Sequence, residues 1–230
     1  MSVAVLLISA IPAHSHFYVT ATETQKSLPE LFSEVSEAAP LDTVTHDLPP
    51  SPEEIATAQP LFSDEIRVVP FYSQLTDISS PQWQKVGCGI ASLAMVIEYY
   101  KPNSVSVNEL LKQGIAADAF LPDAGWTHGG LIGLSQKYGL DGASHSLAES
   151  SMSEAFQALE EILKEGPVMV SVHYTFDPQN PIPHLVVVNT VENGKVYYND
   201  PAERAGGGSI SISKFQSAWK KRYIAIRPVS

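Results

Sequence analysis

VGCGIASLAMVIEYYKP (residues 86–102) is the stretch of sequence that decides the fold. Apolar side chains recur at helical spacing from Ile90 to Tyr100 and stop at Pro102, so the pattern predicts a helix over residues 88–100. The glycines on either side of Cys88 indicate a turn immediately before that helix. Cys88 is therefore expected at a helix N-terminus, where unpaired N–H groups and the helix dipole favour a thiolate over a thiol.

Cys88 is the only cysteine among 230 residues. It has no partner for an intramolecular disulfide and no second thiolate for a cysteine-rich zinc site, and no metal is expected. Two interpretations remain. Cys88 is either a reactive nucleophile or a small, buried and inert apolar side chain, which is the usual fate of a free cysteine. The rest of the sequence has to decide between them.

The remaining elements are predicted as helices first and strands afterwards. Capping boxes, glycines and prolines delimit further helices over residues 106–114, 129–138, 151–164 and 213–220. Short runs of β-branched and aromatic residues predict strands over residues 67–72, 168–174, 184–191, 195–199 and 222–227. Helices followed by an antiparallel sheet predict an α+β domain in which the N-terminal helices, above all residues 88–100, pack on that sheet.

Charge divides the chain into two parts. Residues 1–65 contain ten acidic residues and one base, whereas residues 66–230 contain fifteen acidic residues and thirteen bases. The acidic, Pro/Ser/Thr-rich residues 17–65 are expected to be a linker or a propeptide, because such a composition buries too little apolar surface to fold. Residues 66–230 are expected to form the domain. Since they carry no basic stripe, binding to nucleic acid is excluded.

Residues 1–16 begin with a short apolar run over residues 3–11. It resembles the core of a signal peptide, although no basic residue precedes it, and it is too short to span a bilayer. The alternative is a strand or short helix packed on the domain. A signal peptide would make the protein extracellular or periplasmic, and without one it would be cytoplasmic. No membrane span is predicted elsewhere.

A nucleophilic thiol needs a base within hydrogen-bond distance and a third group that orients the base. His184 opens the very apolar strand HLVVV (residues 184–188) and is well placed to face a cleft. Asp200 follows the return strand of a hairpin that turns at Asn193-Gly194. Antiparallel pairing brings the two ends of this hairpin together, so His184 and Asp200 are expected to be neighbours. The other histidines of the domain, His128, His145 and His173, are expected to be structural.

The oxyanion that forms when a thiolate attacks a carbonyl needs hydrogen-bond donors. The backbone N–H of Cys88, at the start of its helix, is one candidate. A glutamine side chain is the usual second donor, and Gln74, Gln82 and Gln84 all precede Cys88 closely. From the sequence alone, all three glutamines remain candidates for the second oxyanion donor.

Five motifs in order carry a resemblance to a known family: VPFYSQ (69–74), GCGIASLAM (87–95), GWTHGGL (125–131), HLVVV (184–188) and NDP (199–201). Together they resemble the double-glycine leader peptidases and are most similar to the stand-alone C39-like branch, whose fold is papain-like. The resemblance covers about residues 66–228. It implies that Cys88 is the nucleophile, that His184 is the general base and that Asp200 orients His184.

The same resemblance implies that Gln74 supplies the oxyanion donor. Because the insertion between Gln74 and Cys88 is longer than in the leader-processing branch, Gln82 stays an alternative. The sequence thus predicts a cysteine peptidase that acts on a peptide or protein without a metal or organic cofactor. An acyl or peptidyl transferase on the same scaffold and a non-catalytic peptide-binding module are the other hypotheses.

Overall fold

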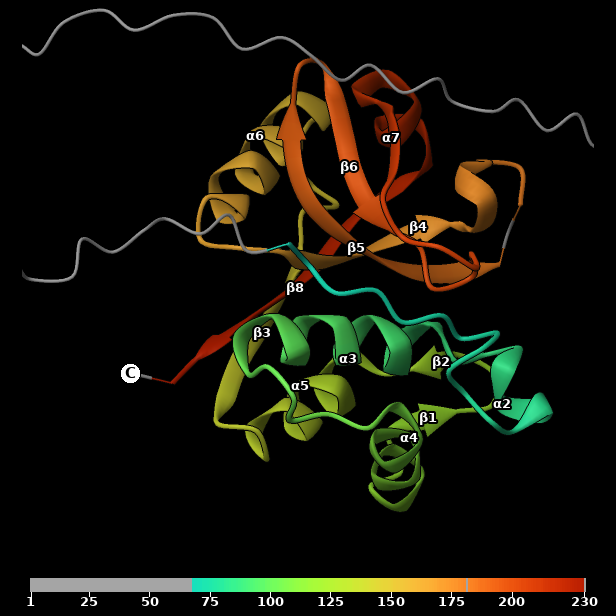
Figure 1. The fold of residues 1–230 in the computed structure, drawn as a ribbon. Coiled ribbons are helices and arrows are strands. Elements are labelled where there is room, and N and C mark those ends of the chain that lie inside the picture. Colours follow the sequence, from blue (N-terminus) through green and yellow to red (C-terminus); the bar gives the residue numbers. More distant parts are fainter. Residues whose placement is uncertain (1–67, 181, 230) are drawn as a thin grey trace, which may run out of the picture. The chain divides into compact units, whose positions relative to one another are not determined.

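The computed structural model of the chain describes residues 68–180 and 182–229 (Figure 1). The expectations for residues 1–16, as a signal peptide, and for residues 17–65, as a linker or propeptide, lie outside the described residues. Within the described part, no helix is both long and apolar enough to cross a membrane.

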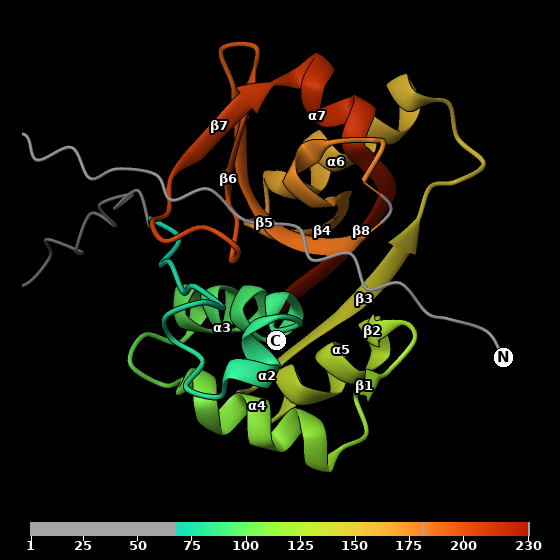
Figure 2. The same ribbon diagram turned by 90° about the vertical axis from the view of Figure 1, so that its right-hand side faces the viewer.

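The framework of the domain is a six-stranded sheet in which every neighbouring pair of strands is antiparallel. Across the sheet, the strands are β3 (Leu140–Ser146), β8 (Trp219–Pro228), β4 (Val168–His173), β5 (Pro183–Glu192), β6 (Lys195–Asn199) and β7 (Gly208–Ser211). Figure 2 shows β3, β8, β4 and β5 following one another across the sheet. The central strands β4 and β5 are rich in valine because both of their faces are buried.

Helices cover both faces of this sheet (Figure 1). The helices are α2 (Pro81–Gln84), α3 (Cys88–Tyr100), α4 (Val107–Ala116), α5 (His128–Gln136), α6 (Met152–Leu163) and α7 (Ile212–Ala218). One apolar core lies between α3, α4, α5 and the sheet, and a second lies between α6, α7 and the opposite face. A two-stranded hairpin, β1 (Phe120–Leu121) and β2 (Gly125–Trp126), and a 3₁₀ turn, η1 (Tyr174–Phe176), complete the described elements. The prediction of an α+β domain is confirmed.

Helix α3 is the most deeply buried helix of the domain. All nine residues from Gly89 to Ile97 are buried, as expected for a helix that is apolar on every side. The helix packs against β5, and the Ser92 hydroxyl donates a hydrogen bond of 3.2 Å to the Leu185 carbonyl. The predicted bounds of this helix and its packing on the sheet are both confirmed. The N-terminus of α3 is thereby fixed relative to the start of β5.

The predicted strand over residues 67–72 is wrong for its described part, because residues 68–72 form no strand. Pro70 has no N–H to offer a neighbouring strand. The segment is held instead by the side chain of Asn199, whose amide donates to the carbonyls of Val69 and Pro70 at 3.2 and 3.3 Å. It therefore runs beside the end of β6 without joining the sheet.

The other differences from the predicted elements concern the last helix and strand of the chain and one polar strand. The helix predicted over residues 213–220 ends at Ala218, since Trp219 already begins β8, which also extends beyond the predicted residues 222–227. Strand β3 was not predicted. Its burial pattern is largely exposed, and the polar sequence LDGASHS lacks the β-branched residues that mark a strand.

Gly89 is required by a close approach between α3 and β2. A Cβ atom at this position would lie 2.7 Å from Cβ and 2.8 Å from Cγ of Trp126. We expect Gly89→Ala to lower the free energy of unfolding by about 1–3 kcal/mol, the usual cost of overpacking. Gly133→Ala is the matched control, because nothing lies within 4 Å of its added Cβ in helix α5. The control should gain up to about 1 kcal/mol from helix propensity. Urea denaturation measures both, and a Gly89→Ala variant as stable as the control would contradict the packing.

Candidate active site

Cys88 is the first residue of α3 and is half-buried. The preceding residue, Gly87, occupies the N-cap position and provides no side chain to cap the helix. A side chain there has no room, because a Cβ would meet Ile78 Cδ1 and lie 2.9 Å from the Trp83 carbonyl oxygen. The sulfur of Cys88 therefore lies at an uncapped helix N-terminus, where the helix dipole favours its thiolate.

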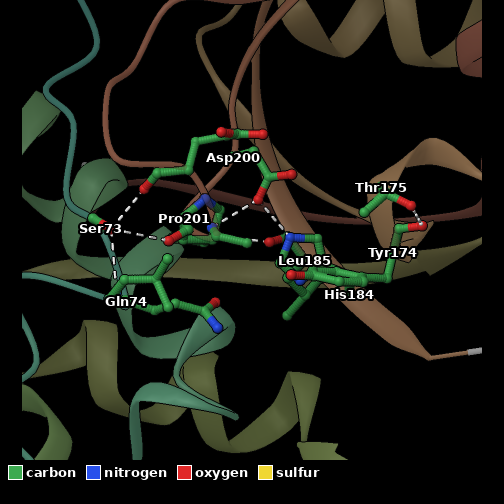
Figure 3. Close-up of polar contacts among 12 residues, drawn as sticks. Ser73, Gln74, Tyr174, Thr175, His184, Leu185, Asp200 and Pro201 are labelled. Carbon is green, nitrogen blue, oxygen red and sulfur yellow. Dashed lines mark hydrogen bonds and ion pairs between the residues drawn. The ribbon is translucent and has the colours of Figure 1, made fainter. Parts of the chain in front are cut away.

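His184 lies near the start of β5, with only 4% of its surface exposed. Its Nε2 atom is 2.6 Å from Oδ1 of Asp200, which follows directly after β6 (Figure 3). The same carboxylate oxygen accepts a hydrogen bond of 2.8 Å from the Ala202 N–H. The Tyr174 ring packs edge-on against the imidazole, with centroids 5.1 Å apart. The imidazole is thus held in place by a carboxylate and by an aromatic ring.

A β-bulge at Asn189 brings Asp200 to the same side of the hairpin as His184. Near the turn, Thr190 pairs with Tyr197, but beyond the bulge Val188 pairs with Tyr198. Continued by two residues, this register sets Asp200 opposite Val186, whose side chain shares a face with that of His184. Without the bulge, Asp200 would lie opposite Val187 on the other face, because a shift of one residue reverses every side chain. The predicted proximity of His184 and Asp200 therefore depends on a bulge that the simple hairpin argument did not contain.

Cys88 and His184 shift each other's pKa toward the charged forms. Burial lowers the pKa of His184, but hydrogen bonds to Asp200 and to Cys88 outweigh it and raise the pKa to about 9. Burial likewise raises the pKa of Cys88, but the hydrogen bond and the charge of His184, with backbone hydrogen bonds to Leu185 and Gly89, together outweigh burial and lower it. Both shifts favour a thiolate paired with an imidazolium over the neutral thiol and imidazole.

Gln74 is buried and lines the same cleft as Cys88 and His184. Its backbone N–H donates 2.8 Å to the Pro201 carbonyl, next to Asp200 (Figure 3). Its side-chain Nε2 donates one hydrogen to the Gln84 carbonyl at 2.8 Å, which leaves the second hydrogen free. Within the described residues, the buried Oε1 atom of Gln74 has no hydrogen-bond partner.

The other two glutamines are placed differently. Gln82 is exposed on α2 and is not among the residues that line the cleft. Gln84 lines the cleft, but its side-chain amide donates to the Ile78 carbonyl at 2.8 Å. Of the three candidates, Gln74 and Gln84 line the cleft with Cys88 and His184, and of these two only Gln74 is buried.

The cleft has a volume of about 1180 Å³ and runs past two of the other histidines. His128 begins α5, after the cap residue Thr127, and its Nδ1 lies 2.7 Å from the Ser144 hydroxyl. His145 stacks on Tyr223 at 4.6 Å between ring centroids. Both line the cleft wall, which the sequence did not reveal.

The third histidine, His173, forms a hydrogen bond of 2.9 Å with the Asn180 carbonyl. No group of three metal-ligating side chains occurs among the residues that the structure describes.

A cysteine at the N-terminus of a buried helix, packed on an antiparallel sheet that carries a histidine, defines a papain-like fold. The profile of the Peptidase C39 like family matches residues 66–229. The chain therefore belongs to this family, which is a family of peptidases. A search of curated proteins found no match.

Solved structures similar to this chain include a protein from Bacillus anthracis described as a C39-like peptidase. It is 22% identical, the alignment covers 72% of this chain and 97% of that one, and the TM-score is 0.51. The peptidase domain of Streptococcus ComA, a bi-functional ABC transporter, is 22% identical over 63% of this chain and 93% of that one, with a TM-score of 0.47. The B. anthracis structure supports the papain-like fold.

The lowered pKa of Cys88 predicts faster alkylation than an ordinary cysteine shows at the same pH. Since Cys88 is the only cysteine, iodoacetamide labelling reports on it alone. His184→Gln removes both the hydrogen bond and the charge that lower the Cys88 pKa, so we expect labelling at pH 6 to slow at least tenfold. At higher pH, as the thiol of the variant ionises and His184 loses its charge, the two rates should approach each other. Mass spectrometry measures both rates, and identical pH profiles would contradict the ion pair.

Proposed function

We propose that this protein hydrolyses peptide bonds as a cysteine peptidase, with Cys88 as the nucleophile, His184 as the acid–base group and Asp200 as the orienting carboxylate. The observation that carries the proposal is the buried hydrogen bond of 2.6 Å between His184 Nε2 and Asp200 Oδ1. Because Nε2 is engaged with Asp200, Nδ1 is the nitrogen available to Cys88, and its proton can be passed to a leaving group.

In the first half of the proposed reaction, the Cys88 thiolate attacks the carbonyl carbon of the scissile peptide bond. The tetrahedral intermediate collapses to a thioester as the C–N bond breaks, and His184 Nδ1 gives its proton to the leaving amine. In the second half, a water molecule attacks the thioester while His184 accepts one of its protons. The C–S bond then breaks, which releases the carboxylic acid product and restores the thiolate and the imidazolium.

Charge on the intermediate is the part of this reaction that fixed donors stabilise most. The backbone N–H of Cys88 and the free hydrogen of Gln74 Nε2 are the donors we assign to this oxyanion. Gln74 is suited to the role because its backbone N–H is bonded to the Pro201 carbonyl and its amide to the Gln84 carbonyl. Both contacts hold the donor in position before the substrate binds.

Cys88→Ala is expected to abolish peptide cleavage and to leave the fold intact, because the side chain is half-buried and alanine fills most of its space. The test incubates the full-length protein with a mixture of synthetic peptides and identifies new termini by mass spectrometry. Circular dichroism and the thermal midpoint check the fold of the variant. Cleavage by Cys88→Ala at the wild-type rate would eliminate Cys88 as the nucleophile. A wild-type protein that binds peptides but cleaves none would favour the peptide-binding module.

Gln74 and Gln82 are distinguished by a pair of matched substitutions. Gln74→Ala is expected to lower kcat by about 10²–10³, the usual loss when one oxyanion donor is removed. Gln82→Ala removes an exposed side chain from α2 and should leave both kcat and KM unchanged. Steady-state kinetics on one cleaved peptide provide both numbers. A larger loss of kcat for Gln82→Ala than for Gln74→Ala would reverse the assignment.

A further inference from the structure

The cleft extends from His184 across the sheet to strand β3. In their order across the sheet, neighbouring strands each contribute a side chain to its wall: Leu185 from β5, Ser171 from β4, Arg222 from β8 and Ser146 from β3. Ser171 pairs with Leu185, and Arg222 pairs with Ser146. These strands lie side by side in the sheet (Figure 2). An extended peptide bound at Cys88 can therefore continue along this wall.

A bulge in β8 places two cationic side chains on the wall. Val170 of β4 pairs with Tyr223, but Val172 pairs with Trp219, so the three residues 220–222 face Ser171 alone. Lys221, at the centre of the bulge, has a φ of 51°, which is unusual for a residue other than glycine. Its ammonium group donates to the carbonyls of Ala148 and Ser150 at 2.6 and 2.7 Å. On either side of it, Lys220 and Arg222 line the cleft.

The positive charges of Lys220 and Arg222 are not neutralised within the described residues. Neither side chain forms an ion pair there. Burial is the larger cause that lowers the pKa of Lys220, and the charge of Arg222 lowers it further, so the two cations are close enough to repel. Beside the imidazolium of His184, the described lining of the cleft contains one further cation, Lys85, and one carboxylate, Asp123.

The wall beside these cations offers hydrogen bonds but no compensating charge. His128 lies within reach of Ser171, with 3.4 Å between Nε2 and the Ser171 hydroxyl, and burial followed by the charge of Arg222 lowers its pKa. His128 is therefore neutral near pH 7. Residues 66–230 as a whole carry more acidic than basic residues, whereas the cleft carries more basic ones. Such a concentration of one sign of charge attracts the opposite charge.

We propose that Lys220 and Arg222 form a subsite that binds acidic side chains of the substrate, so that the protein selects peptides with Asp or Glu near the cleaved bond. This inference rests on the proposed peptidase function. Strands β5 and β8 are separated by two strand spacings, roughly 10 Å, which corresponds to about three residues of an extended peptide. The selected acidic residue is thus expected about three positions from the scissile bond.

The first test measures binding without turnover, in the full-length Cys88→Ala protein. The probes are two dye-labelled peptides of twelve residues, one alternating Ala and Glu and the other alternating Ala and Gln. Fluorescence anisotropy at low ionic strength should give a dissociation constant about threefold to tenfold lower for the Glu peptide, and added salt should reduce the difference.

The second test reverses the charge of the subsite. Lys220→Glu with Arg222→Glu, introduced into the Cys88→Ala protein, should abolish or invert the preference for the Glu peptide. Lys195→Glu with Lys214→Glu is the matched control, because it makes the same change in net charge at two exposed positions that do not line the cleft. The control should keep at least half of the preference. Equal binding of the two peptides by the Cys88→Ala protein, or equal losses in both double variants, would overturn the subsite.

The sequences of the cleaved peptides provide a third test, which separates this inference from the proposed function. Peptides cleaved by the wild-type protein should be enriched in Asp or Glu about three positions from the new terminus, and the subsite variant should lose that enrichment while still cleaving. Cleavage without any acidic preference would overturn the subsite and leave the peptidase standing. Charge-selective binding without cleavage would support the subsite and count against the peptidase.

Discussion

The hydrogen bond between His184 and Asp200 is the contact on which the rest of the site depends. Both groups are buried, and a buried carboxylate is costly unless it is paired and hydrogen-bonded. Here Asp200 accepts from His184 and from the Ala202 N–H, while the adjacent Pro201 carbonyl accepts from Gln74. The turn at residues 200–202 therefore fixes the imidazole and the Gln74 backbone at once. A displacement of this turn would move both groups relative to Cys88.

The same hydrogen bond sets the electrostatics of the sulfur. Burial alone would favour a neutral imidazole and a neutral thiol. Against burial, hydrogen bonds to Asp200 and to Cys88 raise the pKa of His184 to about 9, so the imidazole is charged below that pH. The charged imidazole in turn lowers the pKa of Cys88. The reactive form of the pair therefore lies between the lowered pKa of the thiol and the raised pKa of the imidazole, and it is lost on either side of that window.

The sequence predicted those features of the site that depend on residues within one short segment. Helix α3 has the predicted bounds, because its apolar run and Pro102 are signals within one segment. The proximity of His184 and Asp200 followed from the hairpin. The register that puts both side chains on one face, however, needs the bulge at Asn189, and no residue in this segment predicts a bulge. The strand expected over residues 67–72 does not form at residues 68–72, where Asn199, 130 residues away from Val69, donates to the carbonyls of Val69 and Pro70. Contacts between distant segments decided these points.

Two bulges account for two features of the site that the sequence did not reveal. The one at Asn189 turns Asp200 toward His184, and the one at residues 220–222 presents Lys220 and Arg222 to the cleft. In a regular strand, alternation fixes which side chains face the core and which face solvent. A bulge interrupts this alternation at one point and leaves the rest of the sheet intact, so polar groups can be directed into a cleft beside an apolar core. Both strands that carry these bulges, β5 and β8, have a neighbouring strand on each side, which holds the redirected side chains in place. The two bulges thus direct Asp200 toward His184 and present two cations to the cleft, while the regular pairing around them keeps the apolar core intact.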